Sequence, residues 1–132
     1  MAIQFQIRDG LAEVSFHGDV TTTDLRQLLE TYKDLESRLE TTPDRVADLS
    51  AAQTLNFETS HLREFALVRE AARLKNRVKS AIIAPSLEQF GLARMFQAYN
   101  QNPAIEIMIF KDAPSAYAWL GRVPKPGATP NV

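Results

Sequence analysis

The chain has 132 residues, no cysteine, two histidines and a formal net charge of −1. A chain of this length forms one domain, and it buries enough surface to fold without a disulfide or a structural metal. The missing cysteine excludes disulfide frameworks, thiolate metal sites and cysteine nucleophiles. His17 and His61 alone remain for histidine chemistry.

Charge is distributed unevenly along the chain. Residues 1–58 carry 5 basic and 11 acidic side chains, whereas residues 59–132 carry 10 basic and 5 acidic ones. Six of the basic residues lie between Arg63 and Lys79. This segment is either a solvated helix face or a docking surface for an acidic partner or anionic lipid head groups. The overall balance does not indicate a nucleic-acid-binding protein.

The ends of the chain show no targeting or membrane segment. The N-terminus lacks a basic stretch followed by an apolar one, so no secretory signal is predicted. Apolar runs are far shorter than the roughly 18 residues that span a bilayer. We therefore expect a cytoplasmic protein that does not cross a membrane. Residues 122–132 contain three prolines and are predicted to form a flexible tail after a domain at residues 1–121.

The first part of the chain predicts a β-hairpin. Apolar and polar residues alternate over residues 3–8, and Asp9-Gly10 is a dipeptide favoured in two-residue turns. A second strand is predicted over Leu11–Phe16. Leucines and a tyrosine then recur at helical spacing over residues 25–39, after three threonines that can cap the helix.

Strands and helices alternate after this hairpin and helix. A short strand over Arg45–Leu49 and a loop over Ala51–Phe57 precede a helix from about His61 to Arg77. Val78–Ala84 is a continuous apolar strand, typical of one covered on both faces.

The remaining elements have clear local signals. Ser86 and Gln89 fit a capping box at the start of a third helix, which extends to about Tyr99. Ile105–Phe110 is another apolar strand, and Asp112 can cap a last helix that ends at Gly121. The order ββαβαβαβα predicts a single α/β domain with a mixed, mostly parallel sheet and about four helices.

A search for catalytic motifs finds none. The five glycines form no phosphate-binding loop, and no nucleophile elbow or zinc motif is present. Ser60 and His61 are adjacent in sequence, but neighbours on a helix point in different directions. Asp48 and Glu58 could form a catalytic carboxylate pair, but nothing in the sequence indicates a polar catalytic site around them. We therefore expect a non-enzymatic protein without a cofactor or a metal.

Ser60 is chemically suited to accept a phosphate. The segment Glu58-Thr59-Ser60 opens the second predicted helix, where free N–H groups and the helix dipole favour negative charge. Asp48 at the end of the preceding predicted strand completes this candidate site. The simpler alternative is that Thr59 or Ser60 only caps the helix.

A second candidate site lies toward the C-terminus. Four aromatic residues and a methionine are predicted on two helices: Phe90, Met95, Phe96, Tyr99 and Trp119. They are either core residues or the lining of a pocket for a small apolar ligand near the third helix.

The element order and three local segments resemble the STAS domain, whose type members are the SpoIIAA-like anti-sigma-factor antagonists. The segments are Phe16-His17-Gly18-Asp19-Val20, Val46-Ala47-Asp48-Leu49-Ser50 and Phe57-Glu58-Thr59-Ser60-His61-Leu62. In this resemblance the phosphorylated hydroxyl of the family falls on Ser60. Glu58 replaces an aspartate and His61 a glycine, and His61 brings a side chain close to the hydroxyl.

Later segments resemble a divergent and largely uncharacterised SpoIIAA-like branch. They are Phe90–Phe96, Ile109–Asp112 and Ala116–Leu120. This branch is also similar to Sec14-type lipid-binding domains. The resemblances together cover about residues 3–121.

Two functions follow from these resemblances and the residue patterns. One is a regulatory protein-interaction module, switched by phosphorylation of Ser60, with an anti-sigma factor or a kinase-like protein as its partner. The other is a protein that binds lipid or another small apolar ligand. A homodimer is compatible with either, and the sequence identifies no interface for it.

Overall fold

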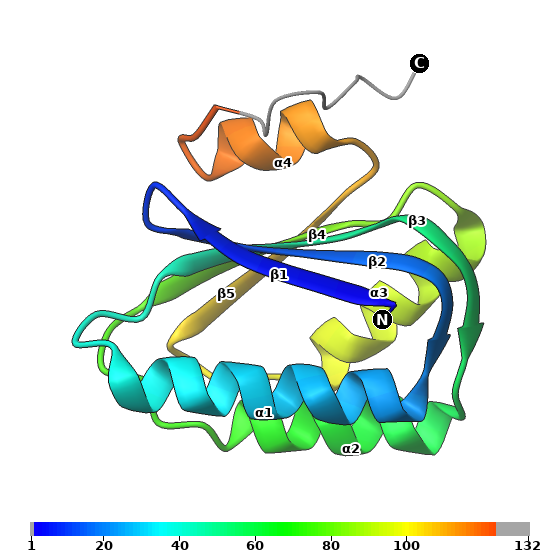
Figure 1. Ribbon diagram of the computed structural model, residues 1–132, viewed down its shortest axis with the longest axis horizontal. Coiled ribbons are helices and arrows are strands. Elements are labelled where there is room, and N and C mark those ends of the chain that lie inside the picture. Colours follow the sequence, from blue (N-terminus) through cyan, green and yellow to red (C-terminus); the bar gives the residue numbers. More distant parts are fainter. Residues whose placement is uncertain (1, 124–132) are drawn as a thin grey trace.

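The computed structural model describes residues 2–123 and shows an α/β domain (Figure 1). The predicted order ββαβαβαβα is confirmed. The elements are β1 (Ile3–Arg8), β2 (Leu11–Thr21), α1 (Thr22–Arg38), β3 (Asp44–Asn56), α2 (Thr59–Glu70), β4 (Val78–Ile83), α3 (Leu87–Tyr99), β5 (Ile105–Phe110) and α4 (Ala113–Trp119).

The five strands form one mixed sheet in the order β1-β2-β3-β4-β5. The β1–β2 pair is antiparallel, and the other three pairs are parallel. Asp9 and Gly10 make the hairpin turn with φ values of 51° and 76°. Both values are positive, as a two-residue hairpin of this kind requires, and Asp-Gly accepts them at low cost.

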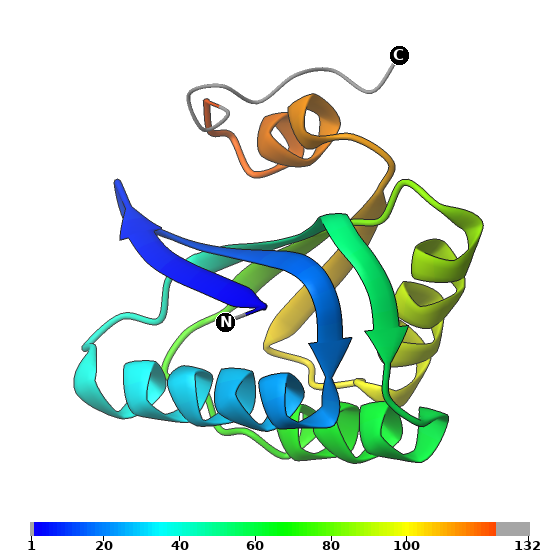
Figure 2. The same ribbon diagram turned by 45° about the vertical axis from the view of Figure 1, so that its right-hand side comes forward.

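Three helices cover one face of the sheet, and one covers the other (Figures 1 and 2). Strands β2 to β5 advance in one direction across the sheet, and crossovers of one hand then place every connecting helix on the same face. These helices are α1, α2 and α3. Helix α4 follows the last strand and packs on the opposite face through Ala116, Tyr117 and Leu120. A cluster of buried apolar residues from β2, α1 and α2 lies on the face covered by α1–α3.

The sequence prediction was wrong about residues 51–57, most of which are strand rather than loop. Strand β3 continues to Asn56 and pairs with β2, which also runs past its predicted end, to Thr21, and so carries His17 in its interior. Register shifts between Ser15 and His17 and after Gly18 interrupt the ladder. These irregularities break the alternation of apolar and polar residues, so the pattern does not predict a strand here.

Helix α2 is shorter than predicted and begins earlier. It spans Thr59–Glu70 instead of running to Arg77. The buried Asn102 side chain donates from Nδ2 to the carbonyls of Arg69, at 3.2 Å, and Ala72, at 2.7 Å. This distant side chain satisfies carbonyl groups at the end of the helix. Arg73, Lys75 and Arg77 therefore lie in the connection between α2 and β4, not on a helix face.

The helix-capping predictions have different outcomes. The capping box of Ser86 and Gln89 is confirmed, and Asp112 accepts from the N–H of Ser115 as predicted. Thr59 and Ser60 do not cap α2, because Glu58 is the N-cap residue and makes no side-chain capping bond. Both hydroxyl residues are instead the first two residues of the helix.

The structure also bears on membrane spans, metal sites and the end of the chain. In the part of the chain that is described, no helix combines the length and apolar character needed to cross a membrane. Residues 2–123 contain no group of three or more histidine, aspartate or glutamate side chains arranged to hold a metal ion. Of the predicted tail, Arg122 and Val123 bond to the β1–β2 hairpin, and residues 124–132 lie outside the described part.

Candidate ligand-binding cavity

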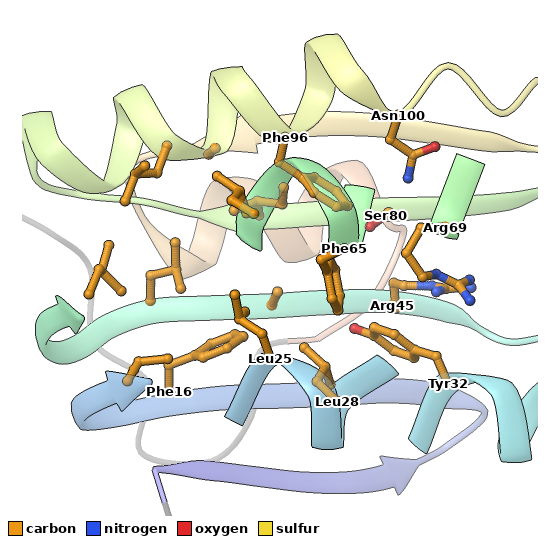
Figure 3. A pocket seen from close by; sticks show the side chains of 18 of the residues that line it. Phe16, Leu25, Leu28, Tyr32, Arg45, Phe65, Arg69, Ser80, Phe96 and Asn100 are labelled. Atoms are coloured by element: carbon orange, nitrogen blue, oxygen red, sulfur yellow. The ribbon is translucent and has the colours of Figure 1, made fainter. Parts of the chain in front are cut away.

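A cavity of about 100 Å³ lies between the sheet and helices α1, α2 and α3 (Figure 3). Twenty residues line it, and nearly all of its surface is apolar. Phe16, Phe65 and Phe96 contribute aromatic rings from β2, α2 and α3, and the rings of Phe65 and Phe96 are 5.7 Å apart. The cavity is partly open to solvent, so it is a pocket that reaches into the core and not a sealed void.

One end of the cavity is built from buried charged groups. Arg45 on β3 and Arg69 on α2 are only 4% and 2% exposed. Both guanidinium groups meet the carboxylate of Glu36 on α1. Arg69 Nη1 donates to Oε1 at 3.0 Å and Nη2 donates to Oε2, whereas Arg45 Nη2 reaches Oε2 at 3.3 Å. Arg69 is thus the closely held partner, and Arg45 the more loosely held one.

The ring of Tyr32 covers both cations. The guanidinium carbons of Arg45 and Arg69 lie 4.6 Å and 5.1 Å from the centre of this ring, within the range of cation–π attraction. Burial raises the pKa of the Tyr32 hydroxyl and lowers the pKa of the Arg45 guanidinium. Both directions follow from low-dielectric surroundings, which disfavour any charged form.

Arg45 also has an unsatisfied donor. Its Nε is buried and has no hydrogen-bond partner. Ser80 on β4 and Asn100, at the C-cap of α3, are buried and line the same end of the cavity (Figure 3). The Oδ1 of Asn100 accepts the N–H of Asn102 at 3.3 Å, so its NH₂ group is the end available to a ligand. Ser80 and Asn100 thus place polar groups beside the two arginines at this end of a largely apolar cavity.

The aromatic residues singled out from the sequence do not surround one pocket. Of the four aromatic residues and Met95, only Phe96 lines the cavity. Phe90 packs against a small buried cluster formed by Ile82, Ala84 and Ala93. Trp119 lies on the opposite face of the sheet, where the centre of its ring is 5.7 Å from that of Phe110. The Tyr99 ring lies 5.6 Å from the guanidinium of Arg63, and Met95 does not line the cavity.

The helix face that does line the cavity has a different composition. Leu92, Ala93, Phe96 and Asn100 are its members on α3. Helical spacing does not say how a helix is rotated on the sheet, and the packing of α3 turns these four residues toward the cavity.

The sequence did not predict the arginine–glutamate cluster, although it contains one signal of a buried arginine. Arg69 continues the buried stripe of Leu62, Phe65 and Ala66 at helical spacing. An arginine on a buried stripe needs an acidic partner. Its partner, Glu36, lies 33 residues away on another helix, and nothing local identifies it.

The structure does not bring all residues of the candidate phosphorylation site together. Glu58, Thr59 and Ser60 are together and exposed at the start of α2, and Ser60 Oγ lies 3.4 Å from a Glu58 carboxylate oxygen. Asp48 lies within β3 on the face that α4 covers in part, and it accepts the N–H of Ser50. His61 bonds to Thr22 Oγ1 on α1 through Nδ1, at 2.8 Å, and so links the starts of two helices.

The buried cluster predicts an unequal response to charge removal. Glu36→Gln leaves two buried guanidinium groups without a carboxylate, and we expect a loss of about 3–5 kcal/mol in the free energy of unfolding. Arg45→Met leaves the balanced Arg69–Glu36 pair and should cost less than about 1.5 kcal/mol. Urea denaturation measures both changes.

The matched control is Glu30→Gln on the same helix. Glu30 forms an exposed pair with Lys33 at 3.5 Å, which is worth at most about 1 kcal/mol. A Glu36→Gln protein that is as stable as the Glu30→Gln protein would show that the cluster does not hold the helices to the sheet.

The sequence and the fold can be compared with known proteins. No protein-family model matches the sequence. No curated protein matches it either. Among solved structures, the chain is similar to an uncharacterised protein of the DUF3478 family with a SpoIIAA-like fold, from Shewanella loihica PV-4.

That similarity covers 90% of this chain and 92% of the other, with a TM-score of 0.59 and 17% sequence identity. At this identity the likeness concerns the arrangement of the elements, which is the arrangement expected from the sequence. The protein therefore has a SpoIIAA-like α/β fold.

Proposed function

We propose that this protein is a non-catalytic binding domain that holds a small apolar or amphiphilic molecule in the cavity. The observation that carries the proposal is the cavity itself, which is almost wholly apolar and lies within the main core. An empty space in a core forfeits packing contacts, and a ligand of suitable shape restores them.

The volume of the cavity limits the size of this molecule. An engineered apolar cavity of about 150 Å³ in another protein holds benzene. A cavity of about 100 Å³ therefore suits a small ring or a short chain. A longer lipid would have to displace lining side chains or extend beyond the cavity, so the part that is bound here is short.

A regulatory role of Ser60 is the second candidate function, and its supporting observation is the exposure of Ser60 in the first turn of α2. Glu58 provides no side-chain cap, so N–H groups at this helix start are open to an anion. Phosphorylation would place charge where the helix dipole favours it. Under this proposal the domain works in the cytoplasm and binds an anti-sigma factor or a kinase-like protein there.

Binding in the cavity can be tested with 1-hexanol, an uncharged probe. Titration into protein with ¹³C-labelled methyl groups should shift the resonances of Leu28, Leu62 and Ile82, which line the cavity. Ala93 is buried and lines it as well, so Ala93→Leu should fill the space and weaken binding about tenfold or more.

Ala98→Leu is the matched control, because Ala98 is exposed on the same helix. It should leave the affinity for 1-hexanol unchanged. Absence of methyl shifts at millimolar 1-hexanol, or equal weakening by the two substitutions, would contradict binding in this cavity.

The role of Ser60 is tested with kinases from the source organism and mass spectrometry of the product. We expect phosphate on Ser60 of the wild-type protein and none on the Ser60→Ala protein. The comparison variants Ser60→Asp and Ser37→Asp place a charge at the start of α2 and near the end of α1. Binding of the partner should change with the first and not the second. Lack of phosphate on Ser60, with equal partner binding by both variants, would exclude the switch.

A further inference from the structure

We propose that the ligand in this cavity carries a single carboxylate, which binds at the Arg45 end while its apolar part occupies the rest. This inference rests on the proposed function, because it requires that the cavity holds a ligand. It adds the chemical class of that ligand, a small amphiphilic monocarboxylate.

The first supporting observation is the charge of the buried cluster. The side chains of Arg45 and Arg69 are 5% and 2% exposed, and that of Glu36 is 12% exposed. No other acidic side chain of the described residues forms an ion pair with either arginine. Two cations and one anion leave one positive charge in excess. A buried charge without a partner is costly, and a monoanionic ligand would balance it.

The second observation is the unequal use of the two guanidinium groups. Arg69 holds Glu36 through both terminal nitrogens. Arg45 makes a single hydrogen bond to Glu36, of 3.3 Å, which is longer than the 2.7–2.9 Å typical of a charge-assisted bond. Its Nε is buried and has no partner. Because guanidinium groups only donate, the missing partner must be an acceptor.

The third observation is the placement of neutral donors beside Arg45. The Ser80 hydroxyl and the Asn100 amide line the same end of the cavity (Figure 3). The rings of Phe65 and Phe96 border the apolar space next to it. A carboxylate could therefore accept from a charged and a neutral donor while its hydrocarbon part contacts aromatic rings. A cavity with one polar end and an apolar remainder selects an amphiphile.

The charge and the volume together favour a carboxylate over a phosphate. One unit of excess positive charge matches a monoanion, whereas a phosphate monoester carries about −1.5 to −2 at neutral pH. A carboxylate is also planar and can accept two parallel bonds from an arginine. In a cavity of about 100 Å³, the smaller head group leaves more space for the apolar part.

The experiment compares hexanoate with 1-hexanol, which has the same carbon chain and no charge. Methyl-resonance titrations give both affinities for the wild-type protein. Bonds to a charged group favour hexanoate, and we expect it to bind about tenfold more tightly or better. Arg45→Met should reduce the affinity for hexanoate to that for 1-hexanol, and binding of 1-hexanol should remain within about twofold.

Two further variants control this comparison. Lys33→Met removes one positive charge from an exposed position on α1 and should leave the preference for hexanoate intact. Ser80→Ala removes a neutral donor and should reduce the preference by a smaller factor, about threefold to tenfold. It also tests the inference if Arg45→Met does not fold.

The outcomes separate this inference from the proposed function. If 1-hexanol binds and hexanoate binds no better, the carboxylate is wrong and the apolar cavity function stands. If neither binds, the proposed function fails as well. A preference for hexanoate that survives both Arg45→Met and Ser80→Ala would overturn the placement of the head group.

Discussion

The carboxylate of Glu36 is the contact on which one end of this structure depends. It lies on α1 and binds guanidinium groups from β3 and α2, so it joins two helices to the sheet. The three charged side chains lie at or close to full burial. Such a cluster contributes little net stability compared with apolar packing, but removing its shared member leaves charges that cannot be solvated. Its geometry therefore constrains how α1 and α2 sit on the sheet.

The cavity borders this charged cluster at one end. The guanidinium carbons of Arg45 and Arg69 lie 4.6 Å and 5.1 Å from the centre of the Tyr32 ring. Apolar side chains of the adjoining core cluster line the cavity as well, among them Phe16, Leu28 and Phe65. The cavity therefore lies where the charged cluster and the apolar core meet (Figure 3).

The sequence predicted those parts of the fold that local chemistry determines. Asp9-Gly10 specifies its turn, and Ser86 with Gln89 specifies a helix start, because each signal acts within four residues. The extension of β3 was missed because its pairing with β2 contains register shifts. The sequence did not predict where α2 ends. The carbonyl groups of Arg69 and Ala72 at this end accept from Asn102, which lies 30 residues beyond Ala72.

The candidate site was harder to predict than the fold. The aromatic residues chosen from spacing proved to lie on both faces of the sheet, because a helical pattern does not say how the helix is rotated. The sequence placed Arg45 in a predicted strand and Arg69 in a basic segment that was interpreted as a solvated face or a docking surface. Their burial depends on Glu36, 9 and 33 residues away. Local patterns identify a buried arginine as unusual, but only the tertiary structure shows its partner.

A crystal structure of the protein with hexanoate tests the central claim most directly. We predict electron density for the ligand between the sheet and α1–α3, with a carboxylate oxygen within about 3.2 Å of Arg45 Nε. Its carbon chain should contact Phe65 and Phe96. A cavity that stays empty at saturating hexanoate, or a carboxylate directed away from Arg45, would contradict the account.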